Sequence, residues 1–415
     1  MALHAPDKED GAMRTRARDS VVMDQMGVVK QNMRDDASRE RVCDQSYIKQ
    51  FNIQSVMATL KQHQPISRTD VARLTGMSPT SITRIVTALL NKELIYETSG
   101  EQRSGRGRKA TNLRVNEDGL YSIGVYLERS MIRLCVMNFA GETLYRCETL
   151  VDGECTPEKM AQESRALYDR MPDEIVGARD KIVAVGVCLS GTVNLCKGIV
   201  THSFQMDWRN IELGRIFSEA FGMTACIEND VKACLIGEKV RMGIEDGVDT
   251  AYLMVGRGIG LAATSGGVMV RGVSNEAGEI SRAPIGTLPD GSSDCLAHYL
   301  REGAMIRKAR ESDPSVHSVD AIVWAAGQGQ EWAKEIIADF RRHLEITVGL
   351  IDGIYNPAKI IVGGEVCRKI YPDIAEAMGK PHLRLGDRHE ESCMTGAALI
   401  AMRCAVIELI GQSIE

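Results

Sequence analysis

Apolar and polar positions follow different periods in successive parts of the chain. Residues 1–45 mix charged and polar residues with little periodicity, and we interpret them as a disordered or loosely helical extension. Residues 46–115 show apolar residues at helical spacing, followed by strand-like runs. Residues 118–238 and 239–415 each alternate strand-like and helical runs, so we predict two α/β lobes with a cleft between them. The final helix, from about Thr395, is expected to pack back on the first lobe.

The first lobe opens with three runs that are expected to form antiparallel strands: YSIGVYL, MIRLCVMNF and ETLYRCETL. A helix through MAQESRALYDRM and a buried strand, IVAVGVCL, follow them. Antiparallel strands followed by this alternation of helix and strand are typical of an α/β lobe.

A pair of helices joined by a tight turn is predicted inside the segment 46–115. The run SRTDVARLTGMSPTSITRIV gives helices over 68–75 and 79–91, and Ser78 is placed to cap the second helix. The positions expected to bury against one another are Ile66, Val71, Leu74, Ile82, Ile85, Val86 and Leu89. This pattern favours a helix-turn-helix, whose second helix reads the major groove of DNA. The candidate DNA-binding residues of the pair are Arg68, Ser78, Thr80, Ser81, Thr83 and Arg84. A helical pair that serves protein contacts is the alternative.

A glycine-rich and arginine-rich loop follows the second helix. The run LIYETSGEQRSGRGRKATNLRV predicts two short strands around this loop, which is the shape of a wing. Arg106, Gly107 and Arg108 have no acid next to them in the sequence, so the guanidinium groups are suited to a narrow minor groove. A merely solvated loop is the alternative interpretation.

Composition limits the classes of function. The chain has 415 residues and a net charge of −6, so we expect more than one domain and only local contact with nucleic acid. No uninterrupted apolar run approaches the roughly 20 residues that span a bilayer, which predicts a cytoplasmic protein without a membrane partner. The twelve cysteines include no CxxC pair, and we expect them to be reduced.

The whole chain after the extension resembles the ROK family, which contains repressors and sugar kinases. The motifs SRTDVARLTGMSPTSITRIV, GRGRK, VGVCLSGTV, IENDVKACLIGE, NEAGEIS, NPAKIIVGGEV and MTGAALIA occur in the order of that family. The resemblance implies an α/β two-lobed actin/hexokinase-like (ribonuclease H-like) effector domain behind a winged helix-turn-helix. It also implies a sugar-responsive repressor of carbohydrate genes, acting as a homodimer or homotetramer on a double-stranded DNA operator.

The resemblance further implies an effector site between the lobes. Asp230 matches the general base of the family's kinases, and a carboxylate beside a sugar hydroxyl accepts its hydrogen bond. Asn229 and Glu279 match residues that hydrogen-bond sugar hydroxyls, and Gly191 of VGVCLSGTV completes the candidate effector site. Ordinary turn chemistry is the alternative for Asn229 and Asp230.

The phosphate loops depart from those of the family's kinases. Where the kinases carry DxGGT, this chain has YLERS from Tyr126 to Ser130, and where they carry GTG it has Arg257 between two glycines. Glu128 and Arg129 replace two glycines and would crowd a triphosphate, and Glu128 would also repel it. We therefore expect no enzyme activity and no cofactor, with Asp230 as a binding group. A sugar kinase with an accessory DNA-binding domain and a regulator controlled by a protein partner are the alternatives.

The family's zinc site is also changed, and the change affects ligand recognition. Arg282 stands where the family has a zinc-binding histidine, and only Cys295 remains of the cysteine ligands, so no metal is expected. An arginine fork suits a carboxylate or a phosphate, and our hypothesis is an anionic effector, a sugar phosphate or a sugar acid. The alternative is that Arg282 pairs with Asp290 or Asp294 and replaces the metal as a loop staple.

Overall fold

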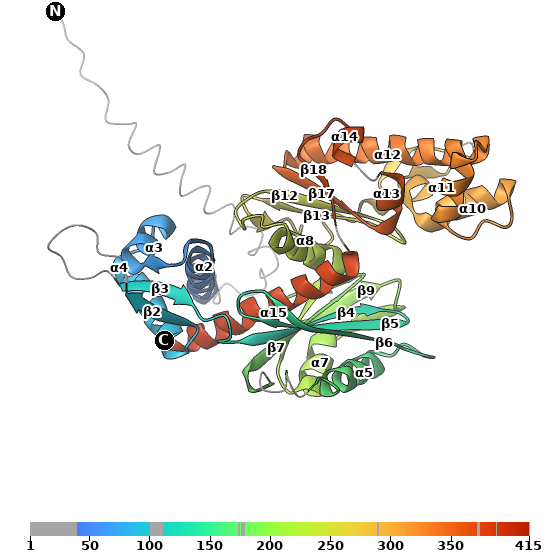
Figure 1. Ribbon diagram of the computed structural model, residues 1–415. Coiled ribbons are helices and arrows are strands. Elements are labelled where there is room, and N and C mark those ends of the chain that lie inside the picture. Colours follow the sequence, from blue (N-terminus) through green and yellow to red (C-terminus); the bar gives the residue numbers. More distant parts are fainter. Residues whose placement is uncertain are drawn as a thin grey trace, which may run out of the picture.

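A small N-terminal domain is joined to two lobes, and a long final helix runs from the lobes to that domain (Figure 1). The computed structural model describes residues 40–99, 111–172, 175, 179–288, 290–371, 374–386 and 388–414. The lobes lie one above the other in Figure 1, with the final helix between them.

The N-terminal domain is a winged helix. Its elements are α2 (Glu40–His63), β1 (Ile66–Ser67), α3 (Arg68–Thr75), α4 (Pro79–Asn91), β2 (Ile95–Ser99) and β3 (Thr111–Val115), with the antiparallel strand order β1-β3-β2. Both predicted helices are confirmed, and Ser78 caps α4 by accepting a hydrogen bond from the Ser81 amide at 3.2 Å. The predicted burial of Leu74 is wrong, because 45% of this residue is exposed in the last turn of the short α3, whose buried contact is made by Val71.

The first lobe is a mixed sheet of order β11-β7-β4-β5-β6. Its elements are β4 (Tyr121–Glu128), β5 (Met131–Asn138), β6 (Thr143–Leu150), α5 (Pro157–Asp169), η1 (Arg179–Lys181), β7 (Ile182–Leu189), β8 (Thr192–Asn194), β9 (Ile199–Ser203), β10 (Trp208–Ile211), α7 (Leu213–Phe221) and β11 (Thr224–Asn229). Strands β4, β5 and β6 pair antiparallel, as their sequence pattern predicts, while β7 and β11 continue the sheet in parallel.

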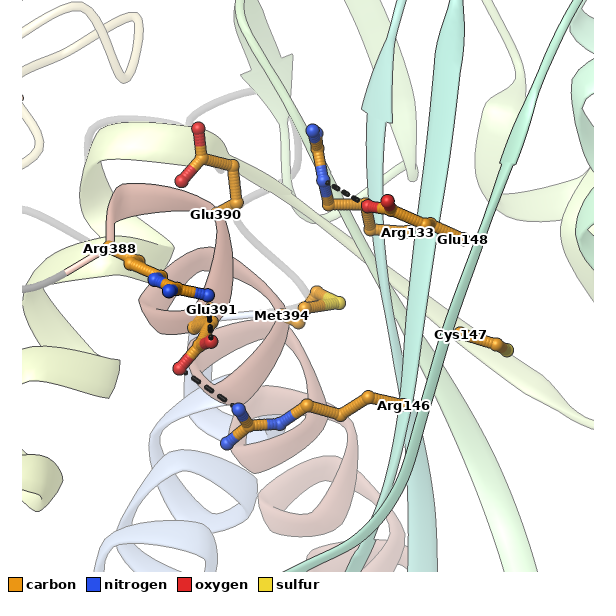
Figure 2. Close-up of a pocket in the computed structure, with 8 residues that line it drawn as sticks. All are labelled: Arg133, Arg146, Cys147, Glu148, Arg388, Glu390, Glu391 and Met394. Carbon is orange, nitrogen blue, oxygen red and sulfur yellow. Dashed lines mark hydrogen bonds and ion pairs between the residues drawn. The ribbon is translucent and has the colours of Figure 1, made fainter. Parts of the chain in front are cut away.

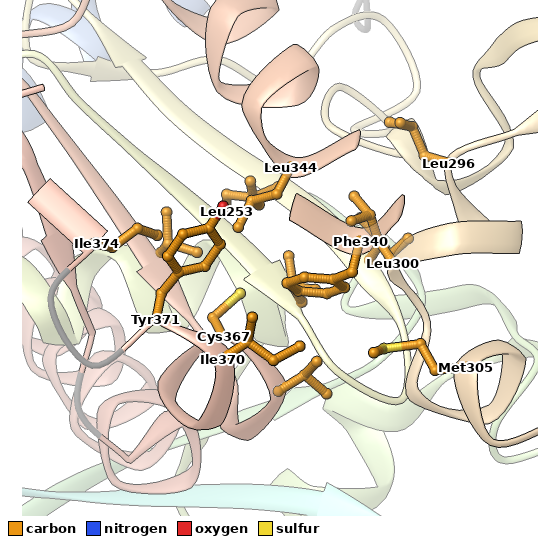
Figure 3. Packing of buried hydrophobic residues seen from close by; sticks show 14 of the residues in the cluster. Leu253, Leu296, Leu300, Met305, Phe340, Leu344, Cys367, Ile370, Tyr371 and Ile374 are labelled. Atoms are coloured by element: carbon orange, nitrogen blue, oxygen red, sulfur yellow. The ribbon is translucent and has the colours of Figure 1, made fainter. Parts of the chain in front are cut away.

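The second lobe has a sheet of order β14-β13-β12-β17-β18. Its elements are α8 (Asp230–Arg241), β12 (Thr250–Val255), β13 (Ile259–Ser265), β14 (Val268–Met269), η2 (Ile280–Arg282), β15 (Pro284–Thr287), β16 (Ser293–Cys295), α9 (Ala297–Leu300), α10 (Glu302–Ser312), α11 (Val319–Gly327), α12 (Glu331–Tyr355), β17 (Lys359–Gly363), α13 (Glu365–Ile370), α14 (Ile374–Ala377) and β18 (Leu383–Leu385). Its core forms where Phe340 and Leu344 of α12 pack against Leu253 of β12 and against Ile370 (Figure 3).

The final helix α15 (His389–Ser413) connects all three parts. Its first half packs against α8 and the first-lobe sheet. Its second half places Met402, Val406 and Ile410 in one hydrophobic core with Ile53 of α2 and Leu89 of α4. By length and composition α15 could cross a membrane, but most of its apolar stretch is buried inside the protein, as in the core helix of a soluble protein.

Close contact between α15 and its neighbours depends on glycine. A Cβ added to Gly186 on β7 would lie 1.9 Å from the carbonyl oxygen of Ala397. A Cβ added to Gly396 would lie 1.8 Å from the carbonyl oxygen of Ala233 on α8. Because backbone atoms lie at these points, a larger residue could fit only if the helices moved apart.

We expect Gly396→Ala to lower the free energy of unfolding by at least about 1–3 kcal/mol, because the added methyl group must push α15 off α8. Urea denaturation of the purified variant measures the change. Gly349→Ala is the matched control: Gly349 is an exposed helical glycine of α12 with nothing within 4 Å, and alanine there should stabilise the protein by up to about 1 kcal/mol. Wild-type stability of Gly396→Ala would contradict the tight crossing.

Candidate DNA-binding and effector sites

One face of α4 is free of the core of its own domain. Thr80, Thr83, Arg84 and Thr87 are exposed along this face, while the opposite face is buried. Their spacing of three and four residues places them in one row along the helix. The row has the composition and position of a surface that enters a major groove.

Several hydroxyl groups on this face already have partners inside α4. The Ser78 and Ser81 hydroxyls lie 2.9 Å apart, and the Thr83 hydroxyl donates to the Pro79 carbonyl at 2.8 Å. Ser78 and Ser81 therefore help to start the helix, and Thr83 can offer DNA only its acceptor lone pairs. Thr80 and Arg84 are the exposed side chains best placed to donate.

The two predicted arginines of the helix pair contact other parts of the chain. Arg68 forms an ion pair with Glu97 of β2 at 2.8 Å, which joins α3 to the wing. The Arg84 guanidinium donates to the main-chain carbonyl of Ile414, directly after α15. A cation is favourable at this point, because the carbonyls at a helix C-terminus carry partial negative charge.

The wing is a hairpin of β2 and β3. These strands pair antiparallel from Ile95 with Val115 to Ser99 with Thr111. Its loop, with Arg106, Gly107 and Arg108, lies outside the described residues.

In the effector domain, β11 ends at Asn229 and α8 begins directly at Asp230. The Asn229 side chain accepts from the Lys232 amide at 3.1 Å and caps α8, and its amide group donates to the Gly191 carbonyl at 3.0 Å. Gly191 has a φ of 153°, and a Cβ there would lie 2.5 Å from the His202 carbonyl oxygen. The structure thus brings Gly191, Asn229 and Asp230 together.

Asp230 is buried, with 2% of the residue exposed. Burial raises the pKa of its carboxyl group, and the positive charges of His389 and Lys232 oppose the rise. One carboxylate oxygen accepts from the Val231 amide at 2.9 Å. A carboxylate kept in such a place can accept a hydrogen bond from a bound hydroxyl with little competition from water.

Glu279 and Arg282 belong to the second lobe. Desolvation raises the pKa of Glu279, the charge of Lys232 opposes this rise, and the charge of Asp230 adds to it. Arg282 lies over the exposed ring of Phe204, with its guanidinium carbon 4.9 Å from the ring centroid. A cation held over an aromatic ring remains available to an anion.

The loop-staple interpretation of Arg282 is wrong. The Asp290 carboxylate accepts from the amide and hydroxyl of Ser292, and the Asp294 carboxylate contacts His298 and Tyr299. Among the described residues, Arg282 makes no ion pair with either aspartate, because Asp290 is held in its own turn and Asp294 of β16 is held by two side chains of α9.

Sequence reasoning missed a polar network that joins the lobes. Arg271 of the second lobe forms an ion pair with Glu228 of the first at 2.8 Å and donates to the Asn275 side chain at 3.1 Å. The Lys232 ammonium donates to the Asn275 carbonyl at 2.9 Å, and the Asn275 amide group donates to Val193 of the first lobe at 3.0 Å. The only available signal was that these residues stand inside the IENDVK and RGVSNEAGE motifs.

A hollow of about 390 Å³ opens elsewhere, between β5, β6 and the start of α15 (Figure 2). Most of its charged side chains are paired with one another: Arg146 with Glu391 at 2.9 Å, Arg133 with Glu148 at 3.0 Å, and Arg388 with Glu391. None of the predicted effector residues lines this hollow.

Comparison with known proteins gives the family. The model of the ROK family matches residues 122–393, and the model of the MarR family matches residues 54–102. This chain belongs to the ROK family. Its fold is that of a two-lobed ROK protein with a MarR-type winged helix in front, as the motif order predicts.

Similar proteins span nearly the whole chain. The xylose repressor of Bacillus spizizenii is 24% identical over 382 residues, which are 88% of this chain and 97% of that protein. The DNA-binding transcriptional dual regulator NagC of Escherichia coli K12 is 25% identical, over 86% of this chain and 87% of that protein. A solved ROK family transcriptional regulator, a homolog of the E. coli MLC protein, superposes with a TM-score of 0.72 at 23% identity, covering 88% and 99%. The ROK hexokinase from Thermus thermophilus superposes with a TM-score of 0.57 at 21% identity, covering 68% and 98%.

Two departures from the ROK kinase motifs contact each other. Glu128, in place of a glycine of the first phosphate loop, lies 3.5 Å from Arg257 of the second loop and also pairs with Arg133. Tyr126, in place of the acid, is buried, with its ring edge-on to His389 at 5.8 Å between centroids. The positions that correspond to the two phosphate loops are therefore joined by an ion pair in this chain.

Proposed function

We propose that this protein is a cytoplasmic, DNA-binding transcriptional regulator, acting as a repressor of carbohydrate genes under the control of a sugar-derived effector. The observation that carries the proposal is a direct contact between the DNA-binding domain and the effector domain. Arg84, on the exposed face of the helix suited to DNA, is bound to Ile414 at the end of the effector domain's last helix. Relatives named as xylose repressor and as NagC support the carbohydrate assignment.

We infer that the effector domain binds without phosphorylating. Magnesium-dependent phosphoryl transfer needs backbone amides close to the phosphates and an acid that holds the metal. Here Glu128 and Arg257 meet between the phosphate loops, and Tyr126 replaces the acid. Asp230 keeps its position beside Asn229, so a hydroxyl group can still be bound there.

The effector proposed is an anionic sugar derivative. Asn229, Asp230 and Glu279 offer partners for hydroxyl groups, and Arg282 offers a planar cation that is held over Phe204 and has no carboxylate partner among the described residues. A guanidinium group in this position can bind a carboxylate or phosphate through two parallel hydrogen bonds.

A homodimer is proposed from an exposed apolar row on α12. Ile346, Leu350 and Ile354 are 46%, 50% and 70% exposed and follow one another at intervals of four residues. Such a row fits the same row of a second copy, since a twofold interface uses one patch twice. A dimer would also present two winged helices to two half-sites.

Substituting Arg84→Ala should weaken binding to the best sequence selected from random DNA by about 1–3 kcal/mol more than binding to unselected DNA, because a base-edge contact discriminates by that amount. Fluorescence anisotropy at fixed salt measures both affinities. Arg215→Ala, an exposed arginine of α7, is the control and should change neither. An equal loss of affinity for the selected and the unselected DNA would mean that Arg84 contacts a phosphate and not a base.

Sugar phosphates or sugar acids should raise the thermal unfolding midpoint, whereas neutral sugars and magnesium-ATP should not. A ligand at about 100 times its Kd stabilises the native state by about 2.7 kcal/mol. The shift should disappear in Arg282→Ala and persist in Arg215→Ala, an exposed arginine of α7. A shift with magnesium-ATP would instead support a kinase, and no shift with any compound would favour control by a protein partner.

Leu350→Glu should convert the dimer to a monomer, because the substitution would bury two like charges at the twofold axis. Light scattering after size exclusion gives the mass of each species. Leu144→Glu, at a 40% exposed apolar position on β6, should leave the mass unchanged. A wild-type protein that elutes as a monomer at micromolar concentration would remove the dimer from the proposal.

A further inference from the structure

Three metal-binding side chains meet where α8 crosses α15. Cys234 comes from the middle of α8, and His389 and Cys393 stand one turn apart at the start of α15. Their donor atoms all lie within 4.8 Å of one another, and Cys393 Sγ is 3.3 Å from His389 Nε2. Two rigid helices thus aim two sulfur atoms and one imidazole at a common point.

The spacing fits the size of a tetrahedral metal centre. Zinc binds thiolate sulfur at about 2.3 Å and imidazole nitrogen at about 2.0–2.1 Å, so neighbouring ligand atoms lie roughly 3.3–3.8 Å apart. Separations of 3.3 Å to at most 4.8 Å need only small side-chain rotations to reach that geometry. His389 and Cys393, at positions i and i+4, share one helix face, which is the usual arrangement of paired ligands on a helix.

Neighbouring groups orient the imidazole. The Tyr252 hydroxyl lies 3.2 Å from His389 Nδ1, which leaves Nε2 directed toward Cys393. The Tyr252 ring stacks on the imidazole, and the Tyr126 ring meets it edge-on. Outer hydrogen bonds of this kind select the tautomer and hold the ring of a metal-binding histidine.

We propose that Cys234, His389 and Cys393 bind one thiophilic metal ion of the zinc or copper(I) class, leaving a fourth coordination position for a water or another ligand. Sulfur and imidazole donors select these ions over magnesium or calcium. The site is separate from the zinc motif of the family, whose positions here hold Arg282 and Cys295. It does not depend on the proposed function.

Packing alone explains the three side chains less well. A free buried cysteine behaves as a small apolar residue, and Cys135 and Cys367 are buried in that way. The partly buried imidazole of His389 is different, because its two polar nitrogens lie against the Tyr252 hydroxyl and Cys393 Sγ rather than in apolar packing. A metal ion would join α8, which begins at Asp230, to α15, which ends beside Arg84.

The test is cobalt(II) titration of the full-length chain after reduction and removal of metal. Wild-type protein should bind one cobalt ion per chain, with a sulfur-to-cobalt charge-transfer band and the intense visible bands of tetrahedral cobalt, and zinc should displace it. Cys234→Ser and Cys393→Ser should lose these bands. Tyr252→Phe, which keeps the ring and removes its hydrogen bond, should weaken binding by about 10–100-fold.

Cys226→Ser is the matched control, because Cys226 faces Cys404 of α15 in a second thiol pair that includes no histidine among the described residues. Its cobalt spectrum should equal that of the wild type. Absence of tetrahedral bands in the wild type would overturn the proposal, as would a Cys234–Cys393 disulfide found by peptide mapping in protein that takes up no metal. If the serine variants fail to fold, X-ray absorption of the wild-type complex must show two sulfur ligands and at least one imidazole.

Discussion

The arrangement of the whole molecule depends on how closely α15 can approach the backbone of its neighbours. At Gly186 and Gly396 the contact is with main-chain oxygen, so no side chain larger than hydrogen fits. Because α15 also carries Met402, Val406 and Ile410 into the core of the winged helix, one tight crossing sets the position of the DNA-binding domain relative to both lobes. A helix packed by backbone contact cannot slide gradually, and interfaces of this kind favour discrete arrangements.

Glu128 shows how a charged side chain is accommodated at a position where the ROK kinases have glycine. A single acidic substitution at Glu128 would leave a half-buried charge without a partner, and such a charge is costly. Here Arg133 and Arg257 supply the compensating charges, one from each lobe. Glu128 therefore contacts both lobes, as does the ion pair of Arg271 with Glu228.

The local sequence pattern predicted the helices and strands well, but it could not predict contacts between residues that are distant in the sequence. Caps and periodicity were sufficient for α3 and α4, because their signals lie within a few residues. Leu74 was misplaced because its exposure depends on where the other helices end. Arg84 and Ile414 are 330 positions apart in the sequence, and neither segment carries a pattern that predicts their contact. The same holds for Cys234, His389 and Cys393, which only the crossing of two helices brings together.

Coupling between the effector site and DNA follows from the contacts of α15. Arg84 cannot donate its full set of hydrogen bonds both to Ile414 and to a base edge, so the base contact that we propose for Arg84 would compete with its contact to Ile414. An effector that binds one of these states more tightly must shift the equilibrium between them, and DNA must change the effector's affinity by the same factor. The start of α15 lies beside Asp230, where Cys393 Sγ is 3.4 Å from the Asp230 carbonyl. The other end of α15 lies beside Arg84, so one helix contacts both the proposed effector site and the proposed DNA-binding face.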